Sequence, residues 1–372
     1  MSLSKKPCPE CGGPMHRGHQ RCGKCRNAQY PVSASPSQQV DADRLRQRSA
    51  GEIAGLKRKY DEALKTIEHQ ESELRAMNVL GQGLDTYTIE PKHGRRTSEG
   101  TAVLVASDWH VEENVGPEVG GLNHYNLDIA RARAQKFFQS GLRLVQLLHR
   151  DINITTVVLA LLGDFISNDI HEEFADIAEL QPMHALVTAQ NMLISGITFL
   201  LENSTARLIM PCHSGNHART TKTTRFSAES GHSLEYLMYL HLAAYFRDQP
   251  RVQFIIPESY HSYLDVYGTT IRFHHGHAIR YQGGVGGIYI PANKAIAQWN
   301  KARHADLDVF GHYHQMRDGG NFIANGSLIG YSGFAVSIKA DYESPKQALF
   351  LMDKKRGKTA VWPILVNEGE SK

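Results

Sequence analysis

The sequence contains no run of 18 or more consecutive apolar residues. A helix that crosses a membrane needs about 20 such residues in succession. The first ten residues, MSLSKKPCPE, also lack the apolar core of a secretory signal peptide. These two absences predict a soluble, cytoplasmic protein without a membrane partner (in the host cytoplasm if the chain is virus-encoded).

Cysteine is scarce and unevenly distributed. Cys212 stands alone in an apolar stretch, where we assign it to core packing. The other four fall in the segment CPECGGPMHRGHQRCGKC, as Cys8, Cys11, Cys22 and Cys25. Two CxxC pairs beside glycines supply the four thiolates of a tetrahedral structural zinc site. Residues 1–30 therefore resemble a zinc ribbon that holds one Zn²⁺. A pair of disulfides, or free thiols, is the alternative.

Most of the chain carries no excess of positive charge. The formal net charge is +3, and residues 1–40 hold six Lys or Arg against one Glu. The remaining 332 residues carry 35 basic and 37 acidic side chains. Four thiolates with one Zn²⁺ subtract two charges, so about +3 stays on the ribbon segment. Basic charge concentrated at one end indicates a polyanionic partner, and we expect nucleic acid, in particular DNA.

The segment after the ribbon changes character twice before residue 101. Residues 31–40 (PVSASPSQQV) are a polar linker rich in Pro and Ser, and residues 81–100 are a second linker. Between them, residues 41–80 lack proline. A largely apolar set of residues, here called the seam, is spaced alternately by three and four positions: Ile53, Leu56, Tyr60, Ala63, Ile67, Gln70, Leu74 and Met77. This pattern predicts a helix, either in a homodimeric parallel coiled coil or lying on the following domain.

From residue 101 to residue 372 the pattern is that of an α/β domain. Apolar strands (TAVLVASD, TTVVLALLGD, ARLIMPCHSGNH) alternate with helices predicted at NLDIARARAQKFFQSGLRLVQLLHRD, from about 171 to 202, and near 230–246. After residue 250, strands with short turns follow, interrupted by the helix PANKAIAQWNKAR. Parallel-type units followed by meander-type strands predict two packed β-sheets with helices outside them.

Each strand end in this domain carries side chains that can bind a metal. They are Asp108 and His110 (SDWH), Asp164 (LLGD), Asn216 and His217 (SGNH), His275 (FHHGH), and His312 and His314 (GHYH). Ligands gather at the carboxyl ends of strands in open α/β sheets. Oxygen and imidazole donors without thiolate suit Mn²⁺, Fe or Zn²⁺, and a bridging carboxylate suits a pair of ions. A glycine before Asp164, Asn216 and His312 lets the backbone turn sharply there.

Taken singly, each histidine is more often a surface or core residue, but the order DxH, GD, GNH, HG, GHxH is specific. In this order the chain resembles the calcineurin-like metallophosphoesterases over roughly residues 101–365. The resemblance implies an αββα sandwich with two divalent ions, Mn²⁺ first and Fe or Zn as alternatives. It implies the following positions: Asp108, His110 and His314 at the first metal, Asn216, His275 and His312 at the second, Asp164 bridging both, and His217 unligated beside the scissile phosphate and the leaving oxygen. His277 is the alternative to His275, and His274 is expected on the opposite face if the strand continues to it.

The sequence departs from two branches of that family. The stretches GNHART and GDFISND lack the acidic residue and the DRG of the phosphoprotein phosphatases. The repair-exonuclease branch has Asp where Ala218 stands, and we expect Arg219 to clamp a phosphate instead. The residue that orients His217 is then open, with Asp169 as a candidate. The stretch DFISNDIHEE resembles virus- and prophage-encoded members, and its residues 171–173 indicate a helix start rather than ligands.

The stretch RYQGGVGGIYIPANK, residues 280–294, is rich in glycine and flanked by Arg280 and Lys294. Such a loop is expected to lie over the metals and contact a substrate phosphate. It lacks the GxxxxGK[ST] spacing, so the sequence does not support a nucleotide-binding P-loop here.

These features favour a two-metal phosphodiesterase acting on nucleic acid, an endo- or exonuclease. A phosphomonoesterase or small-molecule phosphodiesterase is the alternative, which activity on para-nitrophenyl phosphate esters without activity on DNA would reveal. A nucleic-acid-binding scaffold with a vestigial metal centre is a second alternative. It requires missing ligands, and the motif residues are all present.

Overall fold

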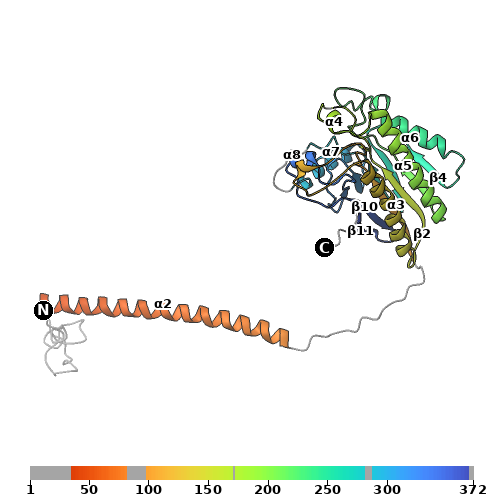
Figure 1. Ribbon diagram of the computed structural model, residues 1–372. Coiled ribbons are helices and arrows are strands. Elements are labelled where there is room, and N and C mark those ends of the chain that lie inside the picture. The colour runs from red at the N-terminus through yellow and green to blue at the C-terminus, as the bar shows by residue number, and fades with distance from the viewer. Residues whose placement is uncertain (1–34, 82–97, 171, 281–286, 368–372) are drawn as a thin grey trace, which may run out of the picture. The chain divides into compact units, whose positions relative to one another are not determined.

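The computed structural model describes residues 35–81, 98–170, 172–280 and 287–367 (Figure 1). The chain divides into two units, Met1–Pro91 and Lys92–Lys372. The predicted zinc ribbon, with Cys8, Cys11, Cys22 and Cys25, lies outside the described residues, as do most of the second linker and residues 281–286 of the glycine-rich stretch.

The first unit contains one long helix, α2 (Pro36–Gly81). It begins inside the predicted linker 31–40, so the linker prediction was wrong for residues 36–40. Proline is tolerated in the first turn because no intrahelical partner is needed there for its missing N–H, and Gln39 N–H already donates to Ser35 O at 3.0 Å. Seam residues of the helix are exposed, with 65% of Ile53 and 66% of Leu56 accessible. What covers this seam stays a prediction.

The second unit is built around a six-stranded sheet with the order β11-β10-β1-β2-β3-β4. Its strands are β1 (Ser98–Ala106), β2 (Ile152–Leu161), β3 (Arg207–Pro211), β4 (Val252–Ile255), β10 (Lys346–Asp353) and β11 (Gly357–Leu365). Strands β1 to β4 are parallel, and β10 and β11 are antiparallel to their neighbours. The carboxyl ends of the first three strands therefore share one edge of the sheet.

A second sheet has the order β5-β6-β7-β9-β8. Its strands are β5 (Ser262–Val266), β6 (Thr269–Phe273), β7 (Leu307–Phe310), β8 (Arg317–Asp318) and β9 (Phe322–Ala324). The pairs β6–β7 and β7–β9 are parallel, so the expected meander is wrong for the centre of this sheet. The reason is α7 (Tyr289–Ala302), which connects β6 to β7 and returns the chain in the same direction.

Helices cover the outer faces of the two packed sheets (Figure 1). α3 (Leu127–His149), α5 (Pro182–Asn203) and α6 (Leu234–Tyr245) pack on the six-stranded sheet, and α7 packs on the second sheet. Strand β1 shows the cause: Leu104 and Ala106 lie in the core under the helices, whereas Val103 and Val105 lie in the core between the sheets. The predicted α/β class, two packed sheets flanked by helices, is confirmed.

The helical stretch predicted from 171 to 202 is two helices, α4 (Glu172–Ile177) and α5. Pro182 begins α5 because it lacks the N–H that a continuous helix would need. Among the described residues, α5 is the one helix with the length and composition of a membrane span. Its residues Leu193 and Ile197 are fully buried against the sheet, as in a core helix. The short elements η1 (Pro117–Val119), η2 (Ser230–His232) and α8 (Gly333–Ser337) complete the unit.

Candidate metal centre

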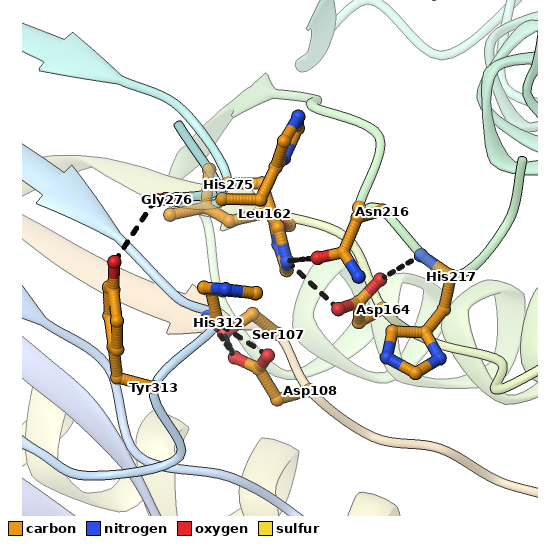
Figure 2. Close-up of polar contacts among 12 residues, drawn as sticks. Ser107, Asp108, Leu162, Asp164, Asn216, His217, His275, Gly276, His312 and Tyr313 are labelled. Atoms are coloured by element: carbon orange, nitrogen blue, oxygen red, sulfur yellow. Dashed lines mark hydrogen bonds and ion pairs between the residues drawn. The ribbon is translucent and has the colours of Figure 1, made fainter. Parts of the chain in front are cut away.

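The strand ends bring the predicted ligands together at one edge of the fold. β1 leads to Asp108 and His110, and β2 leads to Asp164. β3, β6 and β7 then contribute Asn216 with His217, His275, and His312 with His314. In Figure 2 the carboxylates of Asp108 and Asp164, the Asn216 amide and the rings of His275 and His312 lie around one common space.

The donor atoms form three groups, in each of which all atoms lie within 4.8 Å of one another. The groups are Asp108, His110 and His314; His110, Asp164 and His217; and Asp164, His275 and His312. Asp164 and His110 each belong to two groups, so the clusters are contiguous. A carboxylate shared between neighbouring clusters is what a pair of divalent ions needs. The structure thus brings the proposed ligands together, and their coordination of ions stays a prediction.

The cluster around His275 is arranged to attract positive charge. His275 Nδ1–H donates to Leu162 O at 2.6 Å, so its Nε2 faces Asp164 Oδ2 at 2.9 Å and Asn216 Oδ1 at 3.2 Å (Figure 2). Burial alone would lower the pKa of His275, but the Asp164 carboxylate outweighs it and raises the pKa to about 10. An imidazole nitrogen and two oxygen acceptors around one point fit a divalent cation.

The cluster around His110 has an outer layer of hydrogen bonds. His110 Nδ1–H donates to Ser167 Oγ at 2.8 Å, and the Ser167 hydroxyl donates to the Glu113 carboxylate. The His110 Nε2 lone pair then points inward, 3.2 Å from His314 Nε2. Burial lowers the pKa of His110, which keeps the imidazole neutral and able to bind a metal. Outer partners of this kind fix the tautomer of metal-binding histidines.

Two glycines permit the close approach of the donor loops. A Cβ at Gly311 would lie 2.5 Å from Asp108 Oδ2, and a Cβ at Gly215 would overlap the Asp164 carboxylate. Without side chains at these positions, the His312 N–H donates to both Asp108 oxygens at 2.9 and 3.0 Å. Glycine thus keeps bulk away from both carboxylates, as its place in the motifs predicts.

Five of the donor residues have left-handed backbone conformations. Their φ angles are 57° at Asp108, 49° at His110, 53° at Asp164, 73° at His312 and 55° at His314. This region costs a non-glycine residue on the order of 1–2 kcal/mol. Tertiary hydrogen bonds hold it here, such as Trp109 N–H to Asp164 O at 2.8 Å and Leu328 N–H to Asp108 O at 3.0 Å. Strain gathered at one edge of a fold is typical of functional sites.

Sequence reasoning missed Glu235, which joins two donor loops from α6. Its fully buried carboxylate accepts the N–H of Phe165 at 2.6 Å and of Gly215 at 2.7 Å. Burial, together with the nearby Asp164, raises the pKa of Glu235 to about 8. The available signal was a charged residue inside the otherwise apolar stretch LEYLMYLHLAAY.

His217 lies at the shared edge of the clusters and is oriented by Ser167. Its Nδ1–H donates to Ser167 O at 3.1 Å, and its backbone N–H donates to Asp164 Oδ1 at 2.8 Å. Asp169, whose side chain is exposed, was the wrong candidate for this role. Arg219 donates from Nε to Thr221 O at 3.1 Å and from Nη1 to Asn216 O, so two of its donors brace the loop. Its contact with phosphate stays a prediction.

The other two histidines of the FHHGH stretch lie apart from the donor groups. His274 stacks on Phe310 with ring centroids 5.1 Å apart, and its Nε2 lies 3.4 Å from Asp308 Oδ1. Strand β6 ends at Phe273, so the condition for placing His274 on the opposite face of a continuing strand is not met. The His277 ring lies 5.6 Å from the His275 ring, and its Nε2 is 3.5 Å from Glu229 Oε1.

The two basic residues that flank the glycine-rich stretch have different surroundings. Arg280 lines a cavity together with His277. Lys294 is exposed on α7, whose buried residues Ala292 and Ile296 face the second sheet. Substrate contact by either residue stays a prediction.

Neither the family models nor the curated proteins searched give a match to this sequence. Among solved structures, the fold is similar to an archaeal phosphodiesterase (13% identity, 70% of this chain and 99% of that chain, TM-score 0.32). It is similar to a predicted phosphoesterase from Streptococcus pneumoniae (12%, 71% and 98%, TM-score 0.27). It is also similar to the zinc complex of vacuolar protein sorting 29 from Entamoeba histolytica (16%, 72% and 99%, TM-score 0.26). At TM-scores this low, function has to be argued from the site.

Proposed function

We propose that this chain is a two-metal-dependent phosphodiesterase that cleaves nucleic acid, most simply a nuclease acting on DNA. The observation that carries the proposal is the position of Asp164, whose carboxylate belongs to two adjoining groups of donor atoms. Together with the order of motifs, it supports a calcineurin-like metallophosphoesterase. The site residues are then those of the motif: Asp108, His110 and His314 at one ion, Asn216, His275 and His312 at the other.

The donor set fits divalent ions of the borderline class. It combines carboxylate, amide and imidazole atoms without thiolate, which suits Mn²⁺, with Fe or Zn²⁺ as alternatives. Two such ions, held by these residues, would neutralise the charge of a phosphodiester and lower the pKa of a water for in-line attack. The chain itself keeps the donors in place: Ser167 holds His110, Leu162 O holds His275, and Glu235 joins the loops of β2 and β3.

His217 is the group that serves the leaving oxygen. Its Nδ1–H is held by Ser167 O, so Nε2 faces the site; once Nε2 takes up a second proton, the imidazolium can donate to a phosphate oxygen and give that proton to the departing alkoxide. Its ring packs against His110 and Phe174 with centroid distances of 4.9 and 5.2 Å, which limits its rotation. Arg219 still has three N–H donors beyond its two bonds to the loop, and these are available to a phosphate.

The proposal that the substrate is nucleic acid follows from the basic charge of the N-terminal segment. Residues 1–40 have a local charge excess of six basic over one acidic residue. Lys and Arg beside a zinc ribbon at Cys8, Cys11, Cys22 and Cys25 would bind the phosphate backbone and release counterions. The ribbon then recruits the polymer, and the metal centre cuts it in the cytoplasm.

Helix α2 supports a homodimer. Ile53, Leu56 and Tyr60 follow the coiled-coil spacing and are all at least 64% exposed. Such a seam is stabilised when it packs against an identical seam. A dimer would present two ribbons to one polymer, which increases the effective concentration of each binding site.

A digest of end-labelled single- and double-stranded DNA in the presence of Mn²⁺ tests the proposal. We expect cleavage by the wild-type chain and none by Asp164→Asn. Cleavage of para-nitrophenyl phosphate with no cleavage of DNA would instead identify a phosphomonoesterase or small-molecule phosphodiesterase. Equal DNA cleavage by both proteins would contradict the role of Asp164.

A truncation tests the recruiting role of the first unit. Deleting residues 1–90 should weaken DNA binding more than it slows hydrolysis of a small chromogenic diester. DNA binding measured at several salt concentrations should also lose part of its salt dependence, because fewer phosphates are neutralised. Equal losses in binding and in diester hydrolysis would argue against a recruiting module.

A further inference from the structure

A cavity of about 450 Å³ lies beside the His275 cluster. Its lining includes Phe226, Tyr260, His261, His277, Arg280 and Trp299, which we name the aromatic cleft. The volume is typical of sites for small organic groups. The His277 ring lies 5.6 Å from the His275 ring and 6.4 Å from the His312 ring, so the cleft directly adjoins the metal-binding donors.

The walls of the aromatic cleft are flat rings. Phe226 stacks on His277 with centroids 5.2 Å apart and an interplanar angle of 17°, and 47% of Phe226 remains exposed. Tyr260 stands perpendicular to His277 at 5.0 Å, and Trp299 packs on His261 at 4.6 Å. Large aromatic surfaces at a cleft offer stacking to any planar π-system.

The cleft also contains buried polar atoms that call for a ligand. Both ring nitrogens of His277, whose side chain is 4% exposed, and Nε2 of His261 have no hydrogen-bond partner among the described residues. The Glu229 carboxylate is near His277 Nε2, at 3.5 Å. A buried polar atom left unpaired costs free energy that a bound donor or acceptor recovers.

The cleft is fixed relative to the donor clusters. The Tyr260 hydroxyl accepts the N–H of Gly276 at 3.2 Å and of Ala278 at 3.0 Å, in the loop that carries His275. Thr224 lines both the cleft and a smaller neighbouring cavity that includes Asn216 and Arg219. The two cavities therefore adjoin at Thr224, which places the cleft next to the loop of Asn216 and Arg219.

We infer that the aromatic cleft binds the base of the nucleotide whose phosphate lies at the metal centre. A nucleobase combines a π-face for Phe226 with a hydrogen-bonding edge for His277 and His261, and it is joined to an anionic phosphodiester. An alkyl chain would leave the histidine nitrogens unpaired, and a sugar has no planar π-face to lie against Phe226. The inference rests on the proposed function and narrows the substrate class to nucleotidyl phosphodiesters.

Direct binding tests the cleft without any hydrolysis. Each of the four deoxynucleosides, which lack phosphate, is titrated into the full-length chain while tryptophan fluorescence is recorded. We expect at least one nucleoside to quench the emission, Trp299→Phe to remove the quenching, and Phe226→Ala to weaken binding on the order of tenfold. Deoxyribose should give no signal. Absence of quenching by all four nucleosides, or quenching unchanged in Phe226→Ala, overturns the inference.

A kinetic comparison separates this inference from the proposed function. Thymidine 5′-(para-nitrophenyl) phosphate and methyl para-nitrophenyl phosphate share a leaving group and differ in the nucleoside. The ratio of their kcat/KM values should fall on the order of tenfold in Phe226→Ala, recover in Phe226→Tyr, and stay at the wild-type value in Tyr245→Ala, an exposed aromatic residue on α6. A ratio unchanged in Phe226→Ala overturns the cleft assignment. Failure of the wild-type chain to cleave either ester contradicts the proposed function, and the nucleoside titration still decides about the cleft.

Discussion

His110 and His314 face each other with their Nε2 atoms 3.2 Å apart, although 204 positions separate them in the chain. The Nδ1 of His110 is already bonded to Ser167, so its Nε2 presents a lone pair toward the second ring. His314 Nε2 also lies 3.5 Å from an oxygen of Asp108. Two imidazoles and a carboxylate directed at one point are stabilised when a cation lies among them.

Divalent ions should therefore raise the thermal stability of the second unit. At a free Mn²⁺ concentration about 100 times the dissociation constant, the gain is about 2.7 kcal/mol, or on the order of 5–10 °C for a domain of this size. Differential scanning calorimetry with Mn²⁺ and with a chelator measures the shift. Asp164→Asn leaves Cys8, Cys11, Cys22 and Cys25 unchanged and removes a charged oxygen from two of the donor groups, so its shift should be much smaller. An equal shift in both proteins would place the stabilising ions elsewhere.

Under the proposed function, Asp164→Asn should reduce phosphodiester hydrolysis by about a thousandfold or more, because the shared carboxylate would hold both ions and these would contribute several kcal/mol in the transition state. The asparagine retains an oxygen that can accept the His217 N–H, which Asp164 Oδ1 accepts at 2.8 Å, so the fold should persist. Circular dichroism checks the fold. The matched control is Asp169→Asn, an exposed aspartate on the same loop, for which wild-type rates are expected.

Glu235→Ala should destabilise the domain and slow hydrolysis together. The substitution leaves the N–H groups of Phe165 and Gly215 without their acceptor, at a cost of about 1–3 kcal/mol each, and releases the loops that carry Asp164 and Asn216. Urea unfolding measures the first effect and kcat the second. Glu235→Gln keeps one acceptor oxygen and should lose less of both. Wild-type activity in Glu235→Ala would show that the loops hold their positions without this carboxylate.

Breaking the ion pair between Arg272 and Asp308 should strongly destabilise the second sheet. Both side chains are fully buried, with Arg272 Nε 2.7 Å from Asp308 Oδ1 and Nη2 2.9 Å from Oδ2. Arg272→Ala leaves a buried carboxylate without its partner and should cost about 3–5 kcal/mol of unfolding free energy. Replacing both residues, as Arg272→Met with Asp308→Leu, should cost less than the single change. A greater loss of unfolding free energy in the double variant than in Arg272→Ala would mean that the attraction within the pair exceeds the cost of desolvating both charges.

The same pair predicts a dependence of stability on pH. Burial acts to raise the pKa of Asp308, but hydrogen bonds from His274 and Arg272 outweigh it and hold the pKa below its ordinary value of 3.8. A carboxyl whose pKa is lower in the folded state stabilises the fold above its unfolded pKa. That contribution is lost as the pH falls below about 4 and through the folded-state pKa. Unfolding free energies measured over this range should show the loss in wild type and a smaller one in Asp308→Asn.

The proposed dimer through helix α2 should dissociate when the apolar seam of the helix is charged. Leu56→Asp places a carboxylate in the apolar seam and should shift a dimer toward monomer, as measured by light scattering over a range of concentrations. Arg58→Asp lies outside the seam and should leave the dimer intact. A monomeric wild-type chain at all concentrations would contradict the coiled coil.

The strand ends could be predicted from the sequence because each is a local signal, an apolar run followed by a metal-binding side chain. A glycine stands between the two at Asp164, Asn216 and His312, and a serine at Asp108. Glu235 was not predictable, because its partner Phe165 lies 70 positions away and a glutamate in a helix has no distinctive pattern. The orientation of His217 was missed for a related reason, since its partner is a backbone carbonyl, which every residue carries.

The direction of the strands in the second sheet was also not predictable from the sequence. Strands β6 and β7 are parallel because a crossover helix connects them. Short apolar strands have the same sequence pattern whether they pair in parallel or in an antiparallel meander, so their direction could not be predicted. Two helix boundaries were missed for a common reason. A helix can end before a proline or begin at it, and composition alone does not decide between these, as at Pro182 and Pro36.

The left-handed backbone at Asp108, His110, Asp164, His312 and His314 has a consequence for how ions arrive. Because tertiary hydrogen bonds enforce these conformations, the conformational cost is incurred during folding and none is left for the capture of an ion. A preorganised centre of this kind can exchange one metal for another without rearranging the chain. The identity of the resident ion would then follow the supply of metals in the cell as much as the selectivity of the protein.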